Sequence, residues 1–95
     1  MATSKTIGFE ISVSTRDDGT IEAVYIKLAD GKVARTTEIL RDVTLADYDA
    51  SGDLLGIEIL APVRLSKLTS LIEPPRRVSF SKAVKKAVPK ELVLA

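Results

Sequence analysis

The acidic residues on either side of Gly52 are the first group in this 95-residue sequence whose types and spacing suggest chemistry. Segment 47–58 satisfies the calcium-loop pattern D-x-[DN]-x-S-G-x5-E over its full length. In this interpretation Gly52 makes the sharp turn, and carboxylate and hydroxyl oxygens surround the cation. The candidate ligands are Asp47, Asp49, Ser51, Asp53 and Glu58.

The residues that follow this loop favour a β-hairpin over a calcium site. A calcium loop of this kind needs a helix on each side, yet segment 56–62 begins with glycine, contains two isoleucines and ends in proline. Acidic residues and a Ser-Gly pair are also ordinary turn residues. We therefore favour the hairpin, expect no bound metal, and keep calcium binding as a third functional hypothesis.

The composition argues against an enzyme. The sequence has no cysteine and no histidine, which excludes cysteine nucleophiles, imidazole catalysis and Cys or His metal ligands. Asp49 and Asp53 would flank an exposed turn, in water rather than in the buried setting that a general acid needs. The chain offers no nucleophile–base set and no glycine-rich phosphate loop, so we expect no catalytic residue and no cofactor.

Charge is divided along the chain. Through Ala61, six Lys/Arg stand against eleven Asp/Glu, a balance of −5, whereas from Pro62 onward eight stand against two, a balance of +6. The basic residues in the last part of the chain predict phosphate contacts with nucleic acid, which is our second hypothesis. The alternatives are a solvated helix face or a tail lying on the acidic sheet. The basic candidates are Arg76, Arg77, Lys82, Lys85, Lys86 and Lys90.

The elements that must position these residues begin with strands. Alternating apolar residues predict strands over 9–14, 23–28 and 33–40, separated by turns at 16–19 and 30–31. Segment 43–60 predicts a hairpin in which Gly52 adopts the left-handed conformation. Pairing Asp49 with Asp53 would gather one apolar face, composed of Val43, Leu45, Leu55, Ile57 and Ile59.

The opposite face of this hairpin would carry Thr44, Ala46, Gly56 and Glu58. Gly56 beside Ala46 would leave a shallow place, where a helix, an aromatic ring or a partner can approach closely.

The last third of the sequence predicts short helices. Ser66 would cap a helix that runs to Glu73, and a second helix would span 81–88 before Pro89. Segment 92–94 would be a docked strand or an exposed apolar end. The predicted fold is α+β: a four-stranded antiparallel meander with one or two short C-terminal helices on one face. It would form a single domain over 1–95, with the sheet in 6–61 and a helical, basic tail in 62–95.

Two stretches together resemble a widespread bacterial family of small domains of unknown function. Its members show a Y-I-x-L strand, here residues 25–28, and a D-Y-D-x-x-G-x-x-x-G-I-E-I-L hairpin, here residues 47–60. The resemblance covers about residues 9 to 62. The resemblance implies a small antiparallel sheet and offers no catalytic residues. It also argues against calcium binding, since the family is not known for it. This sequence departs from the family in its first strand and in its longer tail after Pro74. Some members of the family resemble small genes that lie beside genes for toxin-like partners.

The leading hypothesis is a non-enzymatic interaction module that self-associates, with a dimer favoured, and binds a small protein partner in the manner of an antitoxin. The open edges of a small sheet need cover, which the tail or a second copy would provide. No segment approaches the roughly 20 continuous apolar residues of a membrane span. Segment 1–7 has no signal-peptide core, so we expect a cytoplasmic protein without membrane contact.

Overall fold

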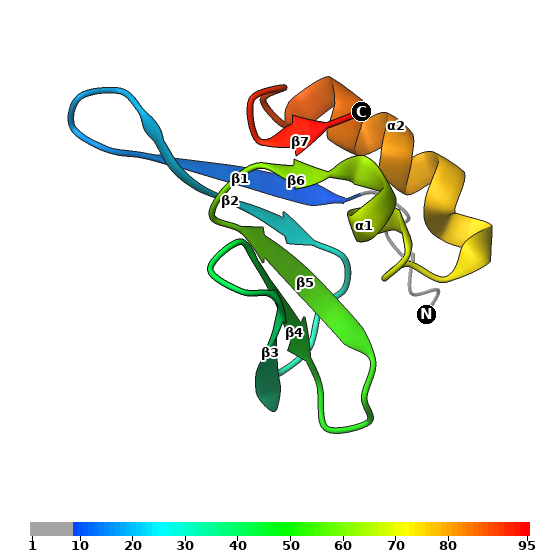
Figure 1. Ribbon diagram of the computed structural model, residues 1–95. Coiled ribbons are helices and arrows are strands. Elements are labelled where there is room, and N and C mark those ends of the chain that lie inside the picture. The colour runs from blue at the N-terminus through cyan, green and yellow to red at the C-terminus, as the bar shows by residue number, and fades with distance from the viewer. Residues whose placement is uncertain (1–8) are drawn as a thin grey trace, which may run out of the picture.

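A computed structural model describes residues 9–95, which form an α+β fold of two layers (Figure 1). One layer is a five-stranded antiparallel sheet in the order β1-β2-β5-β4-β3. The other layer, made of short helices and a two-stranded sheet, covers one face of it. The strands of the main sheet are β1 (Glu10–Thr15), β2 (Ile21–Lys27), β3 (Arg35–Leu40), β4 (Thr44–Tyr48) and β5 (Leu54–Ile59).

The α+β fold and the antiparallel sheet are confirmed, but the predicted four-stranded meander is wrong. The predicted hairpin supplies two strands, and β5 inserts between β2 and β4 instead of following the chain order. This order leaves β3 at an edge, where residues 35–38 are all exposed. In contrast, Leu55, Ile57 and Ile59 of β5 are buried. The most apolar strand therefore has partners on both sides, and the most polar strand borders water.

The hairpin between β4 and β5 has the predicted turn. The Asp49 amide donates to the Asp53 carbonyl at 3.0 Å, and Gly52 adopts the left-handed conformation with φ 87°. The turn is further closed by the Asp49 carboxylate, whose Oδ1 accepts from the amides of Ser51 and Asp53, both at 2.9 Å. The acidic residues of this turn thus perform ordinary turn chemistry.

Beyond the turn, the predicted register is wrong by one residue. A bulge between Asp47 and Tyr48 shifts the pairing, so that Ala46 lies opposite Ile57 and Thr44 lies opposite Ile59. Because side chains alternate along a strand, one extra residue exchanges the faces of everything beyond it. Thr44 and Ala46 are consequently buried on the helix-covered face, while Leu45, opposite Glu58, and Val43 are only half-buried.

The helical layer follows β5 directly. Its elements are β6 (Val63–Arg64), α1 (Leu65–Thr69), the 3-10 turn η1 (Pro74–Arg76), α2 (Arg77–Ala87) and β7 (Val93–Leu94). The first helix is shorter than predicted and Ser66 is not its cap, because Arg64 occupies that position. The helix gives way to i→i+3 bonds, including Ile72 N–H to Thr69 O, and the tighter path leaves Ile72 buried.

The second helix begins earlier than predicted. The Pro74-Pro75 pair does not simply end a helix but starts η1, which leads directly into α2 at Arg77. Helix α2 ends at Ala87, ahead of Pro89. Of the two predictions for segment 92–94, the docked strand is confirmed, since β7 pairs with β6 in parallel.

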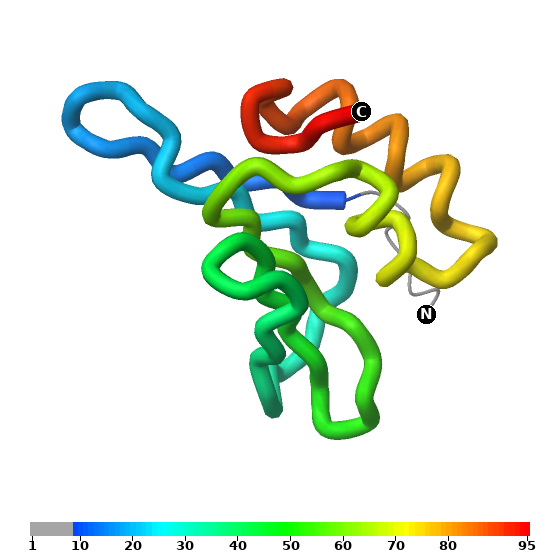
Figure 2. The backbone as a smooth tube through the Cα atoms, in the orientation of Figure 1, coloured from blue at the N-terminus to red at the C-terminus, as the bar shows by residue number. Residues whose placement is uncertain are grey.

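The core lies between the sheet and the helices. Phe80 and Val84 of α2 are fully buried and share one cluster with Leu68, Val24, Ile26, Ile57 and Ile59. Figure 2 shows the β1–β2 and β4–β5 hairpins extending away from this helical layer. In the part of the chain from residue 9 onward, no helix is long and apolar enough to cross a membrane.

Candidate functional site

A hydrogen-bonded cluster occupies the face of the sheet opposite the helices. The Tyr25 hydroxyl on β2 donates to Asp47 Oδ2 on β4 at 2.9 Å. The Thr36 hydroxyl on the edge strand β3 donates to the other oxygen, Asp47 Oδ1, at 2.6 Å. One half-buried carboxylate thus links three strands, although β5 lies between β2 and β4.

Gly56 makes this link possible. It lies on β5 opposite both Lys27 and Asp47, directly beneath the Tyr25 ring. A Cβ added at Gly56 would overlap the Tyr25 hydroxyl and the neighbouring ring atoms. Of the three close approaches predicted at this glycine, by a helix, an aromatic ring or a partner, the structure shows the aromatic ring, and the neighbour on β4 is Asp47 rather than Ala46.

The electrostatics of the cluster keep the phenol protonated. Burial raises the pKa of Tyr25 to about 12, with further contributions from the Asp47 hydrogen bond and the charges of Asp47 and Glu58. A phenol in this state is a hydrogen-bond donor and not a base or nucleophile at neutral pH. The cluster therefore acts as a brace across the strands.

The structure disperses the five predicted calcium ligands. Asp47 faces the brace, Asp49 closes the turn, and Glu58 lies opposite Leu45 on the braced face. The flanking elements are strands β4 and β5 and not helices. Across residues 9–95, no three acidic side chains come together in a group that could hold a metal ion.

The sheet has two open edges in the part of the chain that the structure describes. Strand β1 pairs only with β2, and strand β3 pairs only with β4. The start of β1 is tied to the helical layer, because the Phe9 ring packs edge-on against Phe80 at 5.6 Å. Strand β3 lies away from that layer (Figure 1). The C-terminal strand β7 adds to neither edge, since it pairs with β6.

The six predicted basic residues divide into two groups. Arg76 is directed inward: its guanidinium donates to the Leu28 carbonyl at 3.2 Å and lies over the Phe9 ring at 5.1 Å. Arg77 also binds the backbone, donating from Nε to the Ile72 carbonyl at 2.8 Å. Arg77 nevertheless remains exposed, and so do the four residues of the second group, Lys82, Lys85, Lys86 and Lys90.

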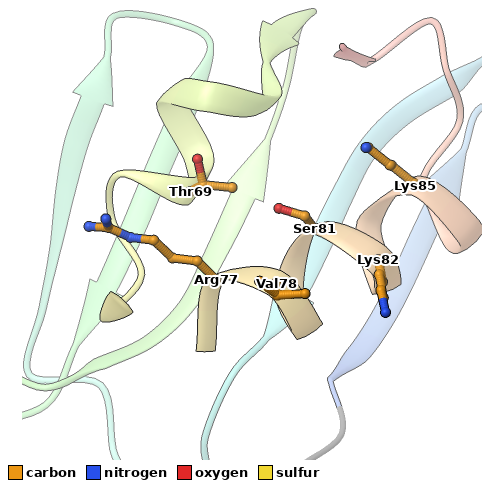
Figure 3. A pocket seen from close by; sticks show the side chains of 6 residues that line it. All are labelled: Thr69, Arg77, Val78, Ser81, Lys82 and Lys85. Carbon is orange, nitrogen blue, oxygen red and sulfur yellow. The ribbon is translucent and has the colours of Figure 1, made fainter. Parts of the chain in front are cut away.

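A shallow groove of about 360 Å³ lies between α1 and α2 (Figure 3). Three of the predicted basic residues line it, and we call this surface the α2 groove. The Ser81 hydroxyl and the Lys85 amine point to the side where Thr69 of α1 lies. The full lining is Thr69, Arg77, Val78, Ser81, Lys82 and Lys85.

Sequence reasoning missed the brace and the hydroxyl lining of the groove. Tyr25 and Asp47 lie 22 positions apart and meet only through the strand order. The one available sign was Gly56 inside the strand Leu54–Ile59, since a glycine within a strand marks a close approach. Nothing in the sequence pairs Thr69 with Ser81, because their helices come together only through packing on the sheet.

Fold and surface together define a small α+β domain with a braced sheet, an open β3 edge and a basic helix. Residues 18–61 match the model of a family described as a protein of unknown function (DUF2283). This match confirms the resemblance to a small domain of unknown function and spans the chain from the β1–β2 turn to the end of β5. No curated protein and no solved structure matches the chain.

Proposed function

We propose that this chain is a non-enzymatic interaction module that self-associates and binds a protein partner by strand addition at the edge of β3. The observation that carries this proposal is the position of β3, which pairs on one side only and lies away from the helical layer. Unpaired backbone groups along an edge strand form a template for another strand.

The composition of β3 supports the addition of a second strand at this edge. Its six residues include Thr36, Thr37 and Ile39, which have high β-propensity, and no proline; the charged residues Arg35 and Glu38 leave Thr36 and Thr37 between them for a second strand to join. The Thr36–Asp47 bond also fixes this edge strand to the sheet. A held, extended edge reduces the entropy lost when a second strand adds to it.

The size of the chain supports self-association. A domain of 95 residues buries a smaller share of its surface than a larger domain does, and a dimer joined through β3 would continue the sheet across two copies. A small protein partner would use the same edge when the second copy is displaced. A cytoplasmic location belongs to this proposal, and fractionation of the source cells would test it.

Light scattering between about 1 and 100 µM tests self-association, since weak strand-mediated dimers dissociate in this range. We expect a dimer that loses mass on dilution. Hydrogen exchange then locates the interface: amides within residues 35–40 become protected in the dimer, and those within 10–15 do not. A strict monomer at 100 µM would overturn self-association.

A matched pair of lysine variants separates the two edges. Thr37→Lys places a charge at the centre of β3, and Val13→Lys does the same on β1; both positions are exposed. We expect Thr37→Lys to abolish the dimer and Val13→Lys to leave it intact. The reverse result would move the interface to β1 and contradict the proposal.

A further inference from the structure

We propose that the α2 groove binds the phosphodiester backbone of a nucleic acid, independently of base sequence. This site is separate from the β3 edge and extends beyond the proposed interaction function. Its partner is a strand of regularly spaced phosphates, and its contacts are ammonium, guanidinium and hydroxyl groups of the two helices.

The charge of α2 is the first argument. This helix of 11 residues contains Arg77, Lys82, Lys85 and Lys86 and no acidic residue. At a rise of about 1.5 Å per residue, these cations are distributed along roughly 13 Å of helix, a length over which one strand of a duplex presents about four phosphates. All four are exposed. Among the described residues, none of these four side chains forms a salt bridge.

The groove adds groups that suit a sugar–phosphate backbone. Thr69 and Ser81, which carry hydroxyls, line the groove together with Lys85 (Figure 3). Hydroxyl donors commonly join lysine and arginine in phosphate contacts. Val78, which is 68% exposed, offers an apolar surface to a sugar ring. Arg77 lines the end of the groove, and its side chain is held by the hydrogen bond from Nε to the Ile72 carbonyl.

The rest of the molecule orients the ligand by repulsion. The acidic residues of the β1–β2 tip, Asp17 and Asp18, and of the β4–β5 turn lie on hairpins that extend away from the helices (Figure 2). With a net charge of only +1, attraction of a polyanion depends on this segregation and not on the overall charge. Phosphate should therefore meet α2 and avoid the sheet.

The aromatic residues argue for backbone contacts alone. Phe80 is buried in the core, Phe9 packs against it, and Tyr25 lies on the opposite face of the sheet. The groove has no ring on which a base could stack, as single-strand readers require. We therefore expect duplexes of unrelated sequence to bind with similar affinity.

Fluorescence anisotropy with the full chain and a labelled 20-base-pair DNA duplex in about 50 mM salt tests the proposal. Neutralising three phosphates predicts a slope of log K against log [salt] of about −3, since each contributes about −0.9. Lys82→Gln/Lys85→Gln should weaken binding at least about tenfold and reduce the slope by about 2.

The matched control is Lys32→Gln/Arg41→Gln, which removes the same charge from exposed positions in the first part of the chain. We expect it to leave DNA affinity within about twofold. No binding, or equal loss in the two double variants, would overturn the proposal. Displacement by poly-glutamate at an equal concentration of charges would also overturn it, because the groove would then be a site for acidic protein segments.

Discussion

The helix-covered face of the sheet holds apolar side chains against Phe80 and Val84, whereas the opposite face joins its strands through the Tyr25 hydroxyl and the Asp47 carboxylate. The first face is stabilised by removing apolar side chains from water, and this hydrophobic effect does not depend on the direction of any one contact. The second depends on two oxygen–oxygen distances and on the absence of a side chain at Gly56.

This difference separates stability from register. Burial of apolar area is the larger free-energy contribution, but it tolerates shifts of one apolar residue against another. A hydrogen bond between defined atoms on β2 and β4 does not tolerate such a shift. The covered face thus holds the domain together, and the brace fixes which residues lie opposite one another.

The largest effect is expected on the covered face. Phe80→Ala should lower the free energy of unfolding by about 3–5 kcal/mol, because it empties the centre of the core. Urea denaturation measures the loss. Val78→Ala, on the exposed side of the same helix, is the control and should change stability by less than about 0.5 kcal/mol. Equal effects would mean that α2 is not docked on the sheet.

The brace gives the next largest effect. Gly56→Ala should lower the free energy of unfolding by about 1–3 kcal/mol, since the new methyl group must displace the Tyr25 ring from Asp47. In the background of Tyr25→Ala the same substitution should be nearly neutral, because the ring is gone. A double-mutant cycle measures this coupling. Additive effects would show that the ring does not lie over the glycine.

Removing only the hydroxyl should have a smaller effect. Tyr25→Phe keeps the ring over Gly56 and loses the bond to Asp47, which should lower the free energy of unfolding by about 1–2 kcal/mol. Thr36→Val, which removes the other donor to Asp47 at an exposed position, is the comparison and should have the smaller effect. A larger loss from Thr36→Val would place the centre of the brace at the edge strand.

The pH dependence of stability sharpens this prediction. The pKa of Tyr25 in the folded chain is about 12, above the ordinary value of 10.0, so its proton stabilises the fold below pH 10. That contribution should disappear as the pH rises from 10 to 12. Wild type should therefore lose more stability than Tyr25→Phe across this window, measured by urea denaturation at each pH. Parallel losses would contradict the raised pKa.

The smallest effect should be a gain. The Thr44 hydroxyl is buried without a hydrogen-bond partner among the described residues, and Thr44 is the one buried polar side chain in that part of the chain. Thr44→Val keeps the branched shape and removes the unpaired group, so it should raise the free energy of unfolding by about 1 kcal/mol. Ser12→Val, exposed on β1, is the control. A loss of stability would mean that the hydroxyl has a partner.

Local chemistry in the sequence was sufficient for the turns, the strands and the α+β class. Gly52 could adopt its conformation without strain, and Asp49 could close its own turn, because both effects involve residues a few positions apart. The alternation of apolar residues likewise located the strands of the main sheet, but not the short strand β6. The basic character of α2 followed from its amino-acid composition alone.

The strand order, the bulge at Asp47 and the brace were decided only by the tertiary structure. Placing β5 between β2 and β4 depends on which strand gains most from burial on two sides, a comparison across the whole sheet. The bulge reversed the faces of Thr44 and Leu45, and the strand order brought Tyr25 to Asp47. Local propensity acts between neighbours in sequence, whereas these contacts join residues that become neighbours only when the core closes.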